Sequence, residues 1–487
     1  MAGWFGKNIS VSVSCVLLLF VLVCQAGCRG AKEASASPPP QAQEQPLPPL
    51  QALERYKDTL ASRGLDLSYQ GVLVETLDSH RQLAEHNSDS AFNPASVMKL
   101  ATSLAALASF SPRHYYRTDF LADGRIDPAT RRLEGDLVVE GGTDPMFSMA
   151  DAGEVAVKLS QLGISRVTGR LRIAGSFYYF ATGYRSNLSR ETSAAKLRAA
   201  FGRAGIKIAG ETVFGEKSGT LLVSHYSDEL SSILLYQNAH SSNAVAEVVG
   251  ESVGGPQAIQ SFLIDRLGLN ESDIYVGRAS GLEFNRITPR ASLKVLSALI
   301  DVLKEHSLRP EDIMPVAGVD SGTLRTRLDA GEIRGSVVAK TGTLVSIDNG
   351  VSTLVGIAYT RAHGPLMFAI FNSAGSVYAY RRLQDNFVEE MIAEEGGPSF
   401  VPRTEDALAG ILHAASGETF LCSSGARYDR CRLPGQRFGI SARLSAVVHL
   451  KVFFARDAPA PSHLEVLANT LAAMKAAGIK GSVYTTR

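Results

Sequence analysis

Hydrophobic positions along the chain change their period at a few places, and these changes divide the chain into segments. An apolar run covers 9–23, and the proline-rich stretch 31–50 carries no periodic apolar pattern. Residues 115–225 alternate strand-like runs with helical ones, and helical patterns return from 226 onward. The β-type runs that follow are 335–345, 351–360 and 365–373. This order predicts an antiparallel sheet flanked by helices, with an α/β segment inserted ahead of it.

Composition places the chain among globular proteins of two or three domains. It has 487 residues, of which 45% are hydrophobic and 20% charged, enough for a substantial core. The 49 basic and 48 acidic residues give a formal net charge of +1. No basic run stands out against that balance, so a nucleic-acid partner is not expected.

The N-terminal segment 1–28 has the features of an export signal. Lys7 precedes the apolar run 9–23, which is shorter than a typical membrane span, and the sequence CQAGC ends at Cys28. Small residues before a cysteine resemble the cleavage box of bacterial lipoproteins, although Gln25 replaces the aliphatic residue usual there. We therefore expect a signal peptide with a lipidated Cys28. Simple secretion and an uncleaved anchor are the alternatives.

The next segment, 29–50, is expected to be an extended linker. Residues 31–50 contain six prolines, and a polyproline-type chain of this length reaches about 60 Å at about 3.1 Å per residue. Such a spacer would hold a folded body away from a membrane. The expected location is therefore the periplasm or cell envelope, with a lipid anchor in a bacterial membrane.

Two cysteines remain for the folded body. Cys422 and Cys431 are nine residues apart, and the other three cysteines lie in the export segment. In an oxidising compartment this pair can close a small disulfide loop, and two free thiols are the alternative.

One stretch near the front, FNPASVMKLATSLAAL, places a serine and a lysine at the mouth of an apolar helical pattern. Ser96 and Lys99 are three residues apart, so a helix puts both on one face about one turn apart. Asn93 can cap this helix, and Pro94 suits its first turn. A lysine in apolar surroundings shifts toward its neutral form, which can take a proton from a serine. The alternative is a capped core helix whose lysine reaches water.

Two later elements supply partners for this serine. In NAHSSNAVAEVVGESVG, Ser241 and Asn243 stand at the start of a helical pattern. In RGSVVAKTGTL, a β-type run leads into the third element. That element consists of Lys340, Thr341, Gly342 and Thr343.

Ser-x-x-Lys, Ser-x-Asn and Lys-Thr-Gly, in this order, form the three-part site of penicillin-recognising serine acyltransferases. The chain resembles the class C low-molecular-mass penicillin-binding proteins, the D-alanyl-D-alanine carboxypeptidase/endopeptidase family (peptidase family S13). The resemblance covers about 51–395. It includes LEGDLVVEGGTDPMF at 133–147, GISRVTGRLRI at 163–173, AGIKIAGETVFG at 204–215, SGLEFNRITPR at 280–290 and MPVAGVDSGTLRTRL at 314–328.

Three other stretches match parts of the motifs. SAAK at 193–196 has the Ser-x-x-Lys spacing, but a basic helical pattern follows it, so we interpret it as a solvated face. KSGT at 217–220 precedes the Ser-x-Asn element instead of following it. YQN at 236–238 fits the Tyr-x-Asn form of some β-lactamases and esterases, but it lies at the end of a core helix, whereas Ser241 opens the next one.

The resemblance implies acyl transfer through a covalent ester. Ser96 would be the nucleophile, Lys99 its base, and Ser241 the group that passes a proton to the departing D-alanine amine. Asn243 would hold the amide of the acyl chain. Lys340 and Thr341 would bind the terminal carboxylate, and Gly342 belongs to the same substrate-binding strand. The backbone N–H groups of Ser96 and Thr343 would form the oxyanion hole.

The expected fold is α/β of the α+β type, the penicillin-binding/β-lactamase-like transpeptidase fold. An antiparallel sheet flanked by helices would pack beside a helical lobe that carries Ser96 and Ser241. The serine peptidase domain would comprise 51–114 and 226–398, interrupted by an inserted α/β domain at 115–225. A small α/β extension of unknown role would follow at 399–487.

The predicted function is a serine-type D-Ala-D-Ala carboxypeptidase or endopeptidase that acts on peptidoglycan stem peptides and is inhibited by β-lactams. No cofactor is expected, and the ten histidines show no metal-ligand spacing. One alternative is a β-lactamase or esterase on the same scaffold, but no Glu-x-x-Leu-Asn element lies between Ser241 and Lys340. The other is a non-catalytic wall-binding lipoprotein, for which a disrupted motif set would be expected.

Overall fold

The computed structural model describes residues 49–181 and 189–399, together with the backbone of five strands between 421 and 486. The predicted signal peptide with Cys28 and nearly all of the predicted linker lie outside the described residues. None of the helices in the described ranges combines the length and apolar composition that a membrane span requires.

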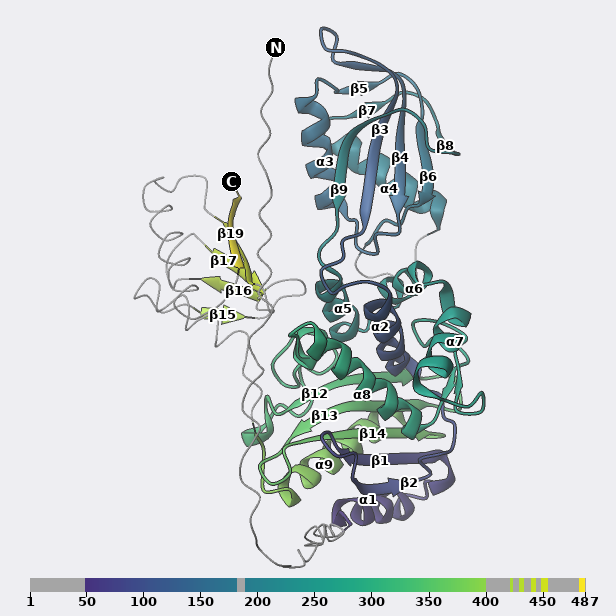
Figure 1. The fold of residues 1–487 in the computed structure, drawn as a ribbon, viewed down its shortest axis with the longest axis vertical. Coiled ribbons are helices and arrows are strands. Elements are labelled where there is room, and N and C mark those ends of the chain that lie inside the picture. Colours follow the sequence, from purple (N-terminus) through teal and green to yellow (C-terminus); the bar gives the residue numbers. More distant parts are fainter. Residues whose placement is uncertain are drawn as a thin grey trace, which may run out of the picture. The chain divides into compact units, whose positions relative to one another are not determined.

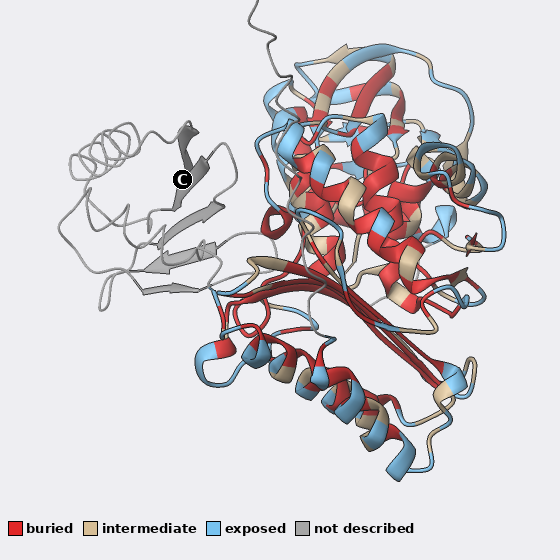
Figure 2. Cartoon of the chain, turned by 60° about the horizontal axis from the view of Figure 1, so that its bottom comes forward, coloured by how far each residue is buried: buried red, intermediate tan, exposed pale blue. Residues whose placement is uncertain are grey.

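Strands from the two ends of the described range 49–399 form a five-stranded antiparallel sheet (Figure 1). Its strands, in spatial order, are β12 (Val337–Leu344), β13 (Val351–Tyr359), β14 (Pro365–Ser373), β1 (Gln70–Thr76) and β2 (Gln82–His86). Strands β13 and β14 are buried along nearly their whole length, because helices cover both faces of the sheet (Figure 2). Continuous apolar runs such as those at 351–360 and 365–373 are typical of strands in this position.

Helices from distant parts of the chain cover the sheet. On one face α1 (Gln51–Ser62) packs beside α9 (Val377–Glu394), and on the other α8 (Pro289–Glu305) crosses β14 and β1. Apolar residues of α8 recur with a helical period, and this face is buried. A small two-stranded ladder, β10 (Ile274–Tyr275) with β11 (Arg286–Ile287), precedes α8.

A helical lobe lies beside this sheet and surrounds one apolar helix. The central helix is α2 (Met98–Ser109), in which ten of twelve residues are buried. An α-helix that is apolar on all sides is buried on all sides. Its neighbours are α5 (Leu230–Ala239), α6 (Asn243–Ser252), α7 (Gly255–Leu267) and α8.

Residues 117–226 form a second sheet with its own core, in the segment where the sequence predicts an inserted α/β domain. Its helices are α3 (Met149–Gln161) and α4 (Arg190–Arg203). Its strands are β3 (Arg117–Asp127), β4 (Arg132–Gly142), β5 (Arg166–Val167), β6 (Leu171–Ser176), β7 (Lys207–Ile208), β8 (Thr212–Phe214) and β9 (Thr220–Tyr226). Gly163 and Gly205 follow the two helices with φ of 82° and 90°, the left-handed conformation in which glycine commonly ends a helix.

The described strands of the C-terminal part form a further five-stranded sheet. Its strands, in spatial order, are β15 (Leu421–Ser423), β16 (Asp429–Arg432), β17 (Gly439–Arg443), β18 (Val448–Phe453) and β19 (Gly481–Thr486). The antiparallel pairing of β15 with β16 sets Cys422 directly opposite Cys431. A cross-strand disulfide between them remains a prediction.

Candidate active site

Ser96 lies on a short 3-10 turn, η2 (Ala95–Val97), directly before α2. The sequence predicts one helix across this region, but the α-helix begins only at Met98. The reason is Ala95, whose φ of 47° is left-handed and cannot continue a right-handed helix. Asn93 caps the turn, because its Oδ1 accepts the N–H of Ala95 at 3.0 Å.

Close packing holds this turn in its unusual conformation. The hydroxyl of Thr353 on β13 donates to the carbonyl of Pro94 at 2.8 Å. A Cβ at Gly342 would lie 2.0 Å from Thr353 Oγ1 and 2.5 Å from the Pro94 carbonyl oxygen, and a Cβ at Gly281 would lie 1.8 Å from the Ala95 carbonyl oxygen. Only glycine leaves room for β12 and the 278–281 loop to approach the turn this closely.

Lys99, on the first turn of α2, has no exposed surface and three polar neighbours. Its Nζ lies 2.9 Å from Ser96 Oγ, 2.8 Å from Asn243 Oδ1 and 2.6 Å from the Ser280 carbonyl oxygen. Burial, and then the charge of Lys340, hold the pKa of Lys99 well below its usual value. A neutral amine has two N–H bonds for the two carbonyl oxygens, which leaves its lone pair to accept the Ser96 hydroxyl proton.

Ser241 lies in the turn between α5 and α6, with φ of 52°. Ser242, the next residue, is the one that caps α6, by accepting the N–H of Val245, so Ser241 is free to face the lysine of β12. Lys340 Nζ donates to Ser241 Oγ at 3.0 Å and to the Thr341 carbonyl at 2.6 Å. Full burial lowers the pKa of Lys340 to about 7.

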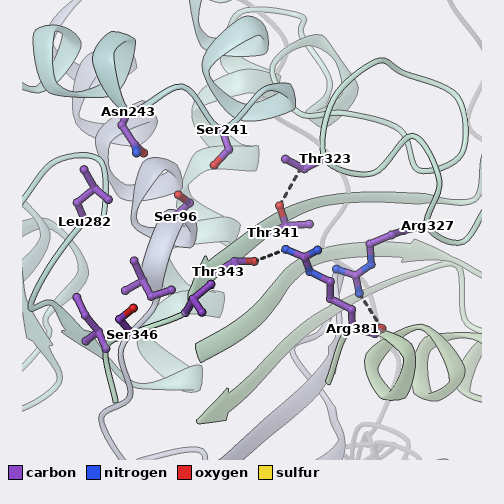
Figure 3. Close-up of a pocket in the computed structure, with 13 residues that line it drawn as sticks. Ser96, Ser241, Asn243, Leu282, Thr323, Arg327, Thr341, Thr343, Ser346 and Arg381 are labelled. Atoms are coloured by element: carbon purple, nitrogen blue, oxygen red, sulfur yellow. Dashed lines mark hydrogen bonds between the residues drawn. The ribbon is translucent and has the colours of Figure 1, made fainter. Parts of the chain in front are cut away.

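A cavity of about 590 Å³ opens in front of these groups (Figure 3). It is lined by Ser96, Ser241, Asn243, Leu282, Thr323, Arg327, Thr341, Thr343, Leu344, Val345, Ser346, Ile347 and Arg381. Lys99 and Lys340 lie behind this lining, fully buried. The structure thus brings together every residue that the sequence predicts for the site within 49–399.

Four polar features of the site are absent from the prediction: Arg381, Arg327, Thr323 and the Ser280 carbonyl. Arg381 Nη2 donates to Thr343 Oγ1 at 3.0 Å, and Thr341 Oγ1 donates to Thr323 Oγ1 at 2.8 Å. Thr323 and Arg327 lie in the stretch 314–328 that carries the family resemblance, but no motif marks them. Arg381, on α9, has no signal in its own sequence neighbourhood.

The two guanidinium groups differ in their partners. Arg327 is buried and donates from Nε and Nη2 to Asp385, at 3.0 and 2.7 Å. Arg381 is only half-buried, and its side chain reaches the cavity beside Thr343. The cavity therefore ends in a row of hydroxyl groups backed by positive charge.

The partial motif matches do not reach this cavity. Asn238 is buried, and its Nδ2 donates to Ser103 Oγ at 3.2 Å and to the Ile313 carbonyl at 2.9 Å. Lys217 belongs to the inserted sheet segment, close to β9. The interpretation of 193–196 as a solvated face is wrong for Ser193, which is fully buried because α4 packs its Ser193 side toward the inserted core.

The fold places a Ser–Lys pair at the cavity, with Ser241 and the strand of Lys340 beside it. The comparisons with known proteins agree with the predicted family. The profile of the D-Ala-D-Ala carboxypeptidase 3 (S13) family matches residues 53–187 and 180–391. The chain belongs to this family. The predicted resemblance is thereby confirmed.

Individual relatives match more distantly. The D-alanyl-D-alanine carboxypeptidase of an Actinomadura species is 28% identical over 206 residues, which is 37% of this chain and 36% of that protein. The chain thus matches little more than a third of this curated relative's length.

Solved structures match over most of their own length. Penicillin-binding protein 4 of Haemophilus influenzae has a TM-score of 0.56 at 19% identity, covering 67% of this chain and 96% of that one. A predatory endopeptidase of Bdellovibrio bacteriovorus, in complex with an immunity protein, has a TM-score of 0.58 at 21% identity, covering 68% and 94%. The same endopeptidase acylated by penicillin G has a TM-score of 0.56 at 22% identity, covering 68% and 94%. These matches confirm the predicted fold class.

Proposed function

We propose that this protein is a serine-type D-Ala-D-Ala carboxypeptidase or endopeptidase that cleaves peptidoglycan stem peptides through an acyl-enzyme and is acylated by β-lactams. The observation that carries the proposal is the fully buried Lys99 amine, 2.9 Å from Ser96 Oγ with two carbonyl oxygens on its other sides. The activity named for the Actinomadura relative and the penicillin G adduct of the Bdellovibrio endopeptidase support it.

In the first half-reaction Ser96 Oγ attacks the carbonyl carbon of the peptide bond while its proton passes to Lys99 Nζ. Negative charge then develops on the carbonyl oxygen, and the N–H groups of Ser96 and Thr343 stabilise it. Loss of one such donor typically costs about 3–4 kcal/mol of transition-state stabilisation. The carbon–nitrogen bond breaks as the leaving amine takes a proton.

The leaving amine takes its proton from the hydroxyl of Ser241. Lys340 then gives a proton to Ser241 Oγ, which its Nζ contacts at 3.0 Å. A pKa of about 7 for Lys340 allows it to hold or release a proton near neutral pH. Asn243 uses its Oδ1 on Lys99, so its amide N–H bonds remain to hold the acyl chain.

The carboxylate of the leaving amino acid fits the far end of the cavity. Thr343 supplies a hydroxyl donor there, and Arg381 adds a guanidinium next to it. Thr341 gives its hydroxyl proton to Thr323, which leaves the hydroxyl proton of Thr323 as the second donor. Charge-assisted hydrogen bonds of this kind are stronger than neutral ones. This end of the site therefore favours substrates whose leaving group carries a free carboxylate.

Fluorescent penicillin tests the proposal. The wild-type protein should form a long-lived adduct that Ser96→Ala abolishes, and purified muropeptides should release D-alanine or be cut at a cross-link. Rapid turnover of the label would instead indicate a β-lactamase, and absence of an adduct would indicate a non-catalytic binding protein. An adduct that persists in Ser96→Ala would refute the assignment of the nucleophile.

We further propose that the protein is exported and anchored by a lipid on Cys28, in the periplasm or cell envelope. The apolar run 9–23, the sequence CQAGC and the proline-rich linker support this location. Metabolic labelling with palmitate tests it, because Cys28→Ala should lose both the label and membrane association. A membrane-bound but unlabelled wild-type protein would indicate an uncleaved anchor instead.

A further inference from the structure

A loop between β10 and β11, residues 278–281, provides one of the acceptors of Lys99. The Ser280 carbonyl accepts from Lys99 Nζ at 2.6 Å, and the Ala279 carbonyl accepts from Thr102 Oγ1 at 2.7 Å. Ser280 is fully buried. The position of the loop therefore decides whether the Lys99 amine keeps its second acceptor.

Glu247 holds the other side of this loop. It lies on α6, one turn after Asn243, which is the other acceptor of Lys99. Its Oε1 accepts the Ser280 N–H at 3.2 Å and the Arg278 Nε at 3.3 Å. The side chain is 15% exposed and is absent from the cavity lining. The peptide unit of Ser280 is thus fixed at its N–H by Glu247 and at its carbonyl by Lys99.

We propose that Glu247 is a positioning residue for the acylation reaction, which holds the 278–281 loop so that the Ser280 carbonyl stays on the Lys99 amine. The inference rests on the proposed function, because it assumes that Lys99 is the base. Glu247 contacts neither Ser96 nor the cavity, so it acts through Ser280 and not on the substrate.

Glu247 also brings a negative charge close to the base. Two charged groups act on Lys99: Lys340 on β12 lowers its pKa, and Glu247 on α6 raises it. Arg278 faces Glu247, and its Nη1 lies 3.7 Å from Glu283. Removal of the charge of Glu247 should therefore lower the pKa of Lys99 further, so that the amine stays neutral down to a lower pH.

Two variants separate the charge of Glu247 from its hydrogen bond. In Glu247→Gln the amide oxygen can still accept from Ser280 N–H, whereas Glu247→Ala removes the acceptor. Glu251→Gln is the matched control, because Glu251 is on the same helix one turn further and bonds outside the site, to Ser176 and Tyr178. The rate of acylation by fluorescent penicillin is measured against pH for all four proteins, together with their thermal unfolding.

In Glu247→Gln the acid limb of the acylation rate plotted against pH should move to lower pH by about half to one unit. The plateau of the same curve should stay within about threefold of the wild type. In Glu247→Ala the plateau should fall about tenfold or more, since a hydrogen bond to a charged group is lost. Glu251→Gln should follow the wild type.

A Glu247→Ala plateau equal to the wild type would overturn the inference. An acid limb of folded Glu247→Gln that coincides with the wild type would refute the effect of the Glu247 charge on Lys99. A wild-type protein that forms no adduct at any pH would contradict the proposed function itself. The two failures are therefore distinguishable in one experiment.

Discussion

Replacement of Lys99 by methionine tests the central chemistry most directly. Methionine has nearly the shape of the lysine chain and suits the apolar surroundings of α2, but it carries no amine. The change leaves Ser96 Oγ without a base and leaves the Ser280 carbonyl without the donor that now lies 2.6 Å from it. The helix itself should form, because ten of its twelve residues are buried.

The expected loss of rate follows from the role of the amine. General-base assistance contributes about 10²- to 10⁴-fold, so the acylation rate of Lys99→Met should fall by about that factor. At about 1.4 kcal/mol per tenfold change, this corresponds to about 3–5 kcal/mol of barrier.

The stability of the same variant should depend on pH in a characteristic way. The pKa of Lys99 is lowered in the folded protein, so between the folded and unfolded pKa values the unfolded chain binds a proton that the folded chain does not. The free energy of unfolding of the wild type therefore rises with pH through this window, by about 1.4 kcal/mol per unit, and levels off above the unfolded pKa. The methionine variant lacks this contribution. Any stability advantage of the variant should shrink as the pH rises through this window, for example from pH 8 to pH 9.5, by up to about 1.4 kcal/mol per unit.

Stopped-flow acylation with fluorescent penicillin and urea unfolding at the two pH values measure both effects. The comparison of variant and wild type cancels the titration of the other groups. An acylation rate within about threefold of the wild type would refute the role of Lys99 as base. A stability difference that does not change with pH would show that the amine is protonated in the folded protein, and the proton-transfer argument would fail with it.

Two further predictions concern β12 and the helix beside it: Gly342 lies on β12, and Arg381 on α9 donates to Thr343 of that strand. Gly342→Ala should lower the acylation rate at least tenfold and destabilise the protein by about 1–3 kcal/mol, because its Cβ would lie 2.0 Å from Thr353 Oγ1. Gly202→Ala, where no atom lies within 4 Å of the added Cβ, should leave the rate unchanged and the unfolding midpoint unchanged or slightly raised, because alanine favours the helix more than glycine does. An equal loss in both variants would contradict the packing argument. Arg381→Met should reduce kcat/KM about ten- to hundredfold for a peptide ending in a free D-alanine carboxylate, and little for its C-terminal amide. An equal loss on acid and amide would remove Arg381 from carboxylate recognition.

Local sequence signals were enough to predict the elements and the main residues of the site. The proximity of Ser96 and Lys99 could be predicted because helical spacing puts positions i and i+3 on one face. The strand that carries Lys340 could be predicted because an apolar β-type run leads directly into it. The order of three short motifs then indicates the family, and the family profile agrees with it.

The same signals did not reveal how the turn around Ser96 is built. The left-handed Ala95 is stable only because Thr353 and the two glycines, Gly281 and Gly342, meet it from other parts of the chain. Nothing in the local pattern distinguishes this 3-10 turn from the first turn of a helix. The buried position of Ser193 escaped for a related reason, since which face of α4 is covered depends on the inserted core.

The sequence by itself determined most of the helices and strands, the pairing of Ser96 with Lys99 and the order of the later motifs, because these depend on periodicity and spacing over a few residues. Only the tertiary structure decided that the Ser280 carbonyl and Asn243, both more than 140 positions after Lys99, take its two N–H bonds, and that Arg381 reaches Thr343. Contacts of this kind arise when distant segments exclude water from a shared core, which also lowers the pKa of both lysines. No short stretch of chain carries that information.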